Sequence, residues 1–225
     1  MPTMKHVSVK NNFIYLTVGI VLLLFVAALV DQFPGLLSHH IIQEFSVINI
    51  LIGLYGLRKT TIWFNTRFGR IIIVIAVIFI GAFLEYFKLS YFHLIFLYLF
   101  YIWAIWLAMK QVLFSGSVSV NEIIGAICIY LLLGLIWTLM YLFVAQAIPG
   151  AFNGIEQQVW YDNFADVAYY SFVTLTTLGY GDISPVAPVA RFLVYMEAVV
   201  GVFYMAILVA SLIGVGINEA HDKKS

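Results

Sequence analysis

The sequence predicts an all-α membrane protein with six transmembrane helices and one shorter re-entrant helix. Hydrophobic residues make up 64% of the 225 residues and charged residues only 10%, whereas roughly a quarter of a soluble domain is charged. The apolar residues gather in stretches of about 20, the length at which a helix crosses a bilayer. Helices are favoured because lipid offers the backbone no hydrogen-bonding partner.

Six apolar stretches qualify as spanning helices. We place them at residues 13–30, 41–57, 71–87, 89–109, 122–148 and 188–217. The second contains Gln43, Glu44 and Asn49, so its first turn is expected at the lipid headgroups. The first follows Lys5 and Lys10, an order that also fits a signal sequence. Because no clear small-residue cleavage site follows it, we favour an uncleaved span.

The placement of charge predicts the orientation. With a cytoplasmic N-terminus, nine of the eleven Lys and Arg residues fall in cytoplasmic segments, and only Lys88 and Arg191 fall outside. Lys and Arg are enriched in cytoplasmic loops, so a multi-pass protein of the cell membrane with both termini in the cytoplasm is expected. The basic cluster at residues 58–70 is explained equally well by attraction to anionic lipid and by topology alone.

Composition argues against several classes of protein. The net charge is zero, so nothing points to nucleic acid. The single cysteine, Cys128, cannot form an intrachain disulfide or a metal site, and it is expected to be a small buried hydrophobe. An intramembrane enzyme would need paired catalytic groups, but the spans hold only Glu197, Glu44 and Asn49 as candidates. We therefore expect neither enzyme activity nor a cofactor.

A different kind of segment lies between the last two spans. Residues 149–161 contain one proline, Pro149, together with two glycines and several polar residues, and are expected to form a loop. Residues 163–176 are too short to span and are predicted to form a re-entrant helix capped by Asp162 or Asn163. The sequence Thr-Thr-Leu-Gly-Tyr-Gly-Asp follows at 176–182.

Residues 178–181 are expected to be non-helical, and non-helical backbone is tolerated at membrane depth only where it lines water or packs inside protein. Gly179 and Gly181 can adopt positive φ, and alternating handedness turns successive carbonyls to one side. Four such strands around an axis would form rings of oxygens that replace the hydration shell of K⁺.

The segment 174–182, Thr-Leu-Thr-Thr-Leu-Gly-Tyr-Gly-Asp, resembles the pore signature of the tetrameric potassium channels. The likeness extends over about residues 122–217 and is greatest to small bacterial members of the family. It implies a homotetramer, since each chain supplies one filter segment.

The resemblance also implies roles for individual residues. The selectivity filter, whose oxygens bind K⁺, would consist of Thr177, Leu178, Gly179, Tyr180 and Gly181. Its supporting residues would be Tyr169, Tyr170, Thr176, Asp182 and Glu197. By analogy, the Tyr169 hydroxyl is expected to bond Asp182, and Tyr170 to pack near Tyr180. Val173 stands where some members carry a glutamate.

The last span carries a glycine and a series of apolar residues at four-residue steps. Gly201 matches the family's hinge glycine, although close helix packing explains it equally well. Met205, Val209 and Ile213 would line a cavity or face lipid. Glu197 is expensive inside a membrane, and we expect a structural brace, a pH sensor, or a residue at the interface without a role.

Residues 1–110 are predicted to form a four-helix peripheral domain, and residues 111–225 the pore domain. A voltage sensor needs arginines on its fourth helix, and residues 89–109 contain none. His39, His40 and His93 are expected near the outer surface, as solvated interfacial residues or proton sensors.

The sequence therefore predicts a potassium-selective channel subunit with weak or no voltage dependence. A non-conducting regulatory subunit and a weakly selective cation channel are the alternatives. A potassium transporter with four filter-like loops is disfavoured by the single loop. Membrane lipid is an expected partner, and a separate regulatory protein stays open.

Overall fold

The computed structural model describes residues 12–33, 38, 40–56, 90–113, 120–156 and 158–222. The long helices are α1 (Asn12–Gln32), α2 (His40–Gly56), α4 (Ser90–Leu113), α5 (Val120–Ala147) and α7 (Pro188–Asp222). The shorter elements are β1 (Phe152–Asn153), α6 (Phe164–Leu175) and β2 (Ser184–Pro185). The described chain is therefore mostly helical, as the sequence predicts.

Four helices in the described part of the chain are long and apolar enough to cross a membrane. They are Phe13–Gln32, Tyr91–Val112, Asn121–Ala147 and Pro188–Leu208. The predicted span at 41–57 is also a helix, but its apolar part, His40–Gly53, is shorter. The predicted span at 71–87 and the basic cluster at 58–70 lie outside the described residues. A total of six spans thus stays a prediction.

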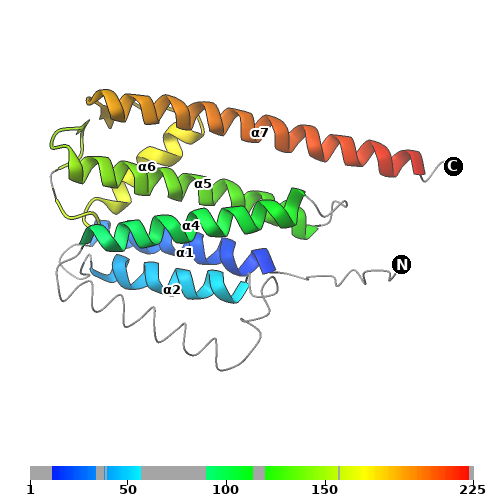
Figure 1. Ribbon diagram of the computed structural model, residues 1–225, viewed down its shortest axis with the longest axis horizontal. Coiled ribbons are helices and arrows are strands. Elements are labelled where there is room, and N and C mark those ends of the chain that lie inside the picture. Colours follow the sequence, from blue (N-terminus) through cyan, green and yellow to red (C-terminus); the bar gives the residue numbers. More distant parts are fainter. Residues whose placement is uncertain are drawn as a thin grey trace.

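The helices pack around one apolar core. Helix α4 lies along α5, and α1 packs against both α2 and α5 (Figure 1). Cys128 is fully buried in this core, which confirms its expected role as a small hydrophobe. This single core contains residues from both predicted domains, the peripheral domain 1–110 and the pore domain 111–225. The boundary between the two domains therefore stays a prediction.

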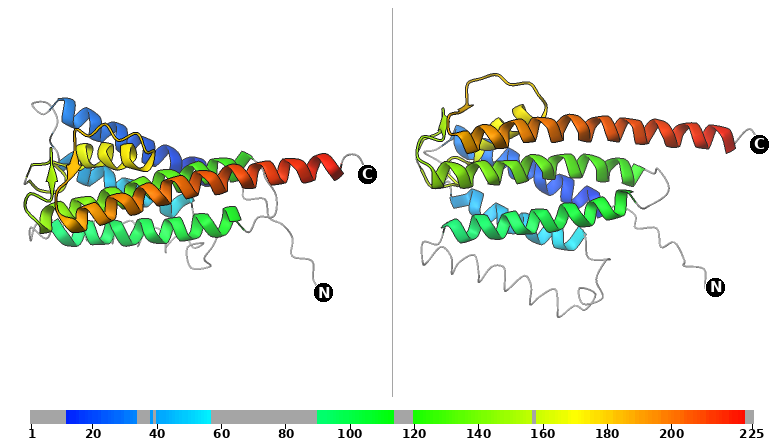
Figure 2. Two further views of the ribbon diagram at one scale, coloured as in Figure 1. Left: turned by 90° about the horizontal axis from the view of Figure 1, so that it is seen from above. Right: turned by 45° about the horizontal axis from the view of Figure 1, so that its top comes forward.

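Helix α6 is held against α5, α7 and α1. The chain leaves the end of α6 and returns to the end of the bundle where α5 stops and α7 begins (Figure 1). On the way, residues 176–187 form a loop that stands off the side of the bundle (Figure 2). The antiparallel pair β1–β2 closes this loop at its far end, with Phe152 opposite Pro185 and Asn153 opposite Ser184.

The start of α6 differs from the prediction in one respect. Asn163 occupies the N-cap position, as expected, but its side chain forms no capping bond. Its Nδ2 donates instead to the carbonyl of Glu156, at 2.7 Å. Asn163 therefore joins α6 to the preceding loop rather than to its own first turn.

Candidate functional site

The loop after α6 has the alternating backbone that the sequence predicts. Among the described residues, Thr177 is the one non-glycine residue with positive φ, at 60°. Gly179 and Gly181 also have positive φ, at 57° and 82°. Every second residue is therefore left-handed, which turns the carbonyls of 177–181 toward a common side. We call residues 177–181 the candidate filter.

Thr177 adopts this conformation despite its branched side chain. A β-branched residue at positive φ is an outlier, and such strain persists only where surrounding contacts impose it. The Thr177 N–H donates to the Thr174 carbonyl at 2.9 Å, and the Leu178 N–H donates to the Val173 carbonyl at 2.9 Å. The Thr176 hydroxyl donates to the Phe172 carbonyl at 2.7 Å. The last turn of α6 thus fixes the start of the candidate filter.

The carbonyl oxygens of the candidate filter are left free. Within the described residues, no hydrogen bond engages a carbonyl of 177–181. The side chains of Leu178 and Tyr180 are 56% and 67% exposed in the single chain. This stretch therefore presents a column of unengaged acceptors, the chemistry that coordinates a hard cation.

Tyr169 holds the far end of the candidate filter, as expected. Its hydroxyl donates to Oδ2 of Asp182 at 2.7 Å, and its ring stacks on Tyr180 with centroids 6.4 Å apart. The hydrogen bond from Tyr169 lowers the pKa of Asp182 and, as its largest cause, raises the pKa of Tyr169 to about 12. Tyr170 was expected to pack near Tyr180, and within the single chain this prediction is wrong. The ring of Tyr170 packs instead against Tyr141 and Phe152.

Helix α7 touches the end of α6 at Gly201. A Cβ added to Gly201 would lie 2.2 Å from the carbonyl oxygen of Leu175, the last residue of α6. Gly201 is therefore a packing residue in this structure, and a hinge role stays a prediction. Met205 is 45% exposed in the single chain, whereas the side chains of Val209 and Ile213 lie outside the described ones.

Glu197 is fully buried, at 0% exposure, so an interfacial position is wrong. Its Oε2 accepts a hydrogen bond from the Tyr141 hydroxyl of α5, and its Oε1 lies 2.6 Å from the Ser171 hydroxyl of α6. Neither partner of Glu197 was expected from the sequence. A glycine inside a span signals close helix approach, and Gly134 of α5, beside Ser171, carries that signal.

His93 was expected to be solvated, and that interpretation is wrong. It is buried, with Nε2 3.2 Å from the hydroxyl of Ser46, and its ring lies 5.3 Å from that of Trp160. Ser46 itself donates to the Gln43 carbonyl at 2.6 Å. His93 of α4 therefore joins α2 to the loop that precedes α6.

Known proteins match the part of the chain that builds this site. Residues 125–217 match a family model described as an ion channel. Over 85 residues the chain is 34% identical to the inward rectifier potassium channel Kirbac3.1 of Paramagnetospirillum magnetotacticum. Residues 125–217 are thus similar to the ion channel family.

The match to this potassium channel is partial. It covers 38% of this chain and 26% of the relative, so the chain spans about a quarter of the length of the curated relative it matches. No solved structure matches the chain. Within the chain, the family-model match runs from α5 through α6 and the candidate filter into α7.

Proposed function

We propose that four copies of this chain form a potassium-selective channel in the cell membrane. The observation that carries the proposal is the alternation of positive φ at Thr177, Gly179 and Gly181. It leaves one-sided, unengaged carbonyls, and rings of such carbonyls replace the hydration shell of K⁺. Each chain contributes one strand, so four are needed to complete the rings. The K⁺ ligands would be the oxygens of Thr177, Leu178, Gly179 and Tyr180.

Exposed apolar surface supports the tetramer. Besides the candidate filter, α7 carries large apolar side chains that nothing covers in the single chain. Among its described side chains, the most exposed are those of Phe203 at 64% and Ile207 at 61%. Lipid covers part of such a surface, but lipid cannot satisfy the carbonyls of the candidate filter. A ring of subunits would enclose the candidate filter away from lipid.

The direction of the helices supports cytoplasmic termini and an outward-facing filter. Helix α1 begins and α7 ends at one end of the bundle, while β1 and β2 lie at the other (Figure 1). The positive-inside rule places the first end in the cytoplasm. Helix α2 also ends there, and α4 begins at the opposite end (Figure 1), so the topology needs one further crossing. The apolar segment 71–87 is the sequence candidate for that crossing.

Voltage dependence is expected to be weak or absent. Steep voltage gating requires charges that move through the membrane field, worth about 2.3 kcal/mol per charge per 100 mV. Helix α4 carries one basic residue, Lys110, in its last turn. Its Nζ lies 3.7 Å from the ring centroid of Trp106, where a cation–π contact holds it. This contact supports a role for Lys110 as an interfacial anchor rather than as a gating charge.

Ion flux from liposomes tests the proposal. We expect purified protein to release K⁺, to exclude Na⁺ under the same gradient, and to be blocked by barium. Flux of both cations would identify a weakly selective channel, and absence of flux from a correctly assembled protein would identify a non-conducting subunit. Native mass spectrometry of the same sample is expected to give four times the mass of the 225-residue chain, and a stable monomer would contradict the assembly.

A further inference from the structure

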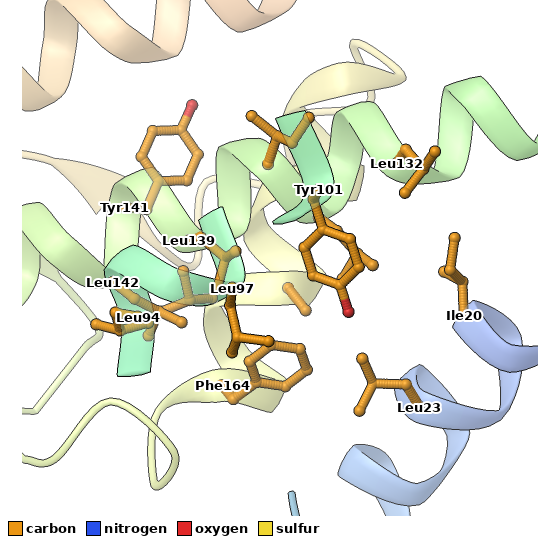
Figure 3. Packing of buried hydrophobic residues seen from close by; sticks show 14 of the residues in the cluster. Ile20, Leu23, Leu94, Leu97, Tyr101, Leu132, Leu139, Tyr141, Leu142 and Phe164 are labelled. Carbon is orange, nitrogen blue, oxygen red and sulfur yellow. The ribbon is translucent and has the colours of Figure 1, made fainter. Parts of the chain in front are cut away.

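Glu197 lies where helices α5, α6 and α7 meet. Tyr141 reaches it from α5, 56 residues away in sequence, and Ser171 reaches it from α6, 26 residues away. The hydroxyl of Tyr141 points out of the apolar cluster (Figure 3). The carboxyl group is therefore the common partner of two helices that flank the one from which it projects.

No cation within the described residues compensates a charge at this position. Lys110 is held over Trp106, and Arg191 donates to the carbonyl of Pro185 at 3.3 Å. The titratable groups that interact with Glu197 are tyrosines, namely Tyr141 and Tyr130 of α5 and Tyr170 of α6. An ionised carboxylate buried without a counterion is very unfavourable, so its surroundings favour the uncharged acid.

The hydrogen bonds around Glu197 require a proton from the carboxyl group itself. The Ser171 hydroxyl oxygen lies 2.6 Å from Oε1 of Glu197 and also 2.8 Å from the carbonyl oxygen of Gly134. Each contact brings two oxygens together and needs a proton between them, but a serine hydroxyl supplies one. Since the carbonyl has no proton, Ser171 donates to Gly134 and Glu197 donates to Ser171.

The remaining contacts agree with this assignment. Oε2 of Glu197 is then the carbonyl oxygen of the acid, and it accepts from Tyr141. Thr138 donates its own proton to the Gly134 carbonyl at 2.7 Å. Every hydroxyl in the cluster therefore donates once. The chain of donors runs from α7 through α6 to α5.

The helices approach one another closely at this cluster. A Cβ on Gly134 would meet the ring of Phe172, the neighbour of Ser171, at 2.5 Å. One turn further along, the carbonyl of Leu175 rests against Gly201 of α7. The same last turn of α6 supplies the Val173 carbonyl that anchors the candidate filter. Any shift of α6 would thus be passed directly to residues 177–181.

We infer that Glu197 is held as an uncharged carboxylic acid and is a positioning residue that joins α7 to α6 and α5 behind the filter. This role rests on the proposed function, because it affects conduction only if α6 carries the filter. The protonation state of Glu197 and the oligomeric state can both be measured without ion conduction. A failure of the channel proposal can therefore be distinguished from a failure of the inference about Glu197.

Infrared spectroscopy tests the protonation state. The difference spectrum between the wild-type protein and Glu197→Gln at neutral pH is expected to contain the C=O stretch of a protonated carboxyl group. Glu156 is exposed, so the matched variant Glu156→Gln is expected to remove carboxylate bands instead. Carboxylate bands in the Glu197 difference spectrum would overturn the inference, whether or not the wild type conducts K⁺.

Flux measurements test the positioning role. Gln offers an acceptor oxygen and a donating NH₂ group in nearly the shape of the uncharged acid, so Glu197→Gln is expected to keep K⁺ flux within about twofold of wild type. Glu197→Leu and Ser171→Ala each break the chain of hydrogen bonds. Because a buried hydrogen bond stabilises the arrangement of α6, its loss is expected to lower K⁺ flux roughly tenfold. If Glu197→Leu fails to assemble, the flux of Ser171→Ala provides the comparison with wild type. Equal flux in wild type and Ser171→Ala, or equal loss in Gln and Leu variants, would refute the role.

Discussion

The Tyr169 hydroxyl donates to Asp182 at 2.7 Å and so links α6 to the residue directly after the candidate filter. The ring of Tyr169 also stacks on Tyr180. Tyr169→Phe keeps the ring and removes the hydrogen bond. We expect this variant to lose K⁺ flux faster under acidification than wild type, because Asp182 then protonates at a higher pH. Flux measured from neutral to acidic pH checks this, and identical profiles would contradict it.

The sign of this effect follows from the two pKa shifts. The pKa of Asp182 is lowered from its ordinary 3.8, so the contribution of the ionised form is present above 3.8 and is lost as the pH falls through the folded-state pKa. The pKa of Tyr169 is raised from 10.0 to about 12, so its contribution is complete below 10.0 and is lost as the pH rises through about 12. The bond is therefore intact throughout the physiological range.

Gly179→Ala tests the backbone handedness of the candidate filter. A Cβ at Gly179 would meet nothing within 4 Å, so its cost is the unfavourable φ alone, roughly 1–2 kcal/mol. We expect K⁺ flux or selectivity over Na⁺ to be lost while the protein still folds. Liposome flux and thermal unfolding measure the two properties on one sample.

Gly150→Ala is the matched control for that substitution. Gly150 has a similar φ of 72°, and a Cβ there also meets nothing within 4 Å, but it lies in the loop after α5. We expect a similar small loss of stability with normal flux. If both alanine variants conduct like wild type, the handedness of Gly179 does not matter for conduction.

Gly201→Ala separates packing from hinge bending. The added Cβ would lie 2.2 Å from a backbone oxygen of α6, so the helices must move apart, and overpacking of this kind costs about 1–3 kcal/mol. We expect a lower unfolding temperature and a weaker tetramer. Gly19→Ala is the control, because its Cβ would meet side-chain atoms of Asn49 and Ile52 at 3.2 Å, which have more freedom to yield. A stable Gly201→Ala protein with altered opening would favour the hinge.

His93→Ala is expected to destabilise the junction between α2, α4 and the loop before α6. It removes the buried bond to Ser46 and the ring contact with Trp160, at a cost of roughly 1–3 kcal/mol. His93→Phe keeps an aromatic ring and should fall between wild type and alanine. Chemical denaturation followed by circular dichroism measures the order. The exposed His40 provides the control, and equal effects of His40→Ala and His93→Ala would contradict the assignment.

The prediction of the fold succeeded where the signal is local. Helix positions follow from runs of apolar residues, and the start of α7 at Pro188 follows from the proline. The positive φ of Gly179 and Gly181 was expected from residue type, and the bond between Tyr169 and Asp182 from family resemblance. The prediction for His93 failed because burial depends on neighbours from α2 and from the loop before α6, which periodicity along one helix does not reveal.

The sequence by itself determined the lipid environment, the described spans and the segment that resembles a potassium filter, because hydropathy and glycine spacing are properties of neighbouring residues. Only the tertiary structure decided what Glu197 contacts and that Gly201 packs against α6. Tyr141 and Ser171 lie 56 and 26 residues from Glu197, and no local pattern connects them. A buried carboxyl group is expensive wherever it stands, but its partners appear only once the helices are packed together.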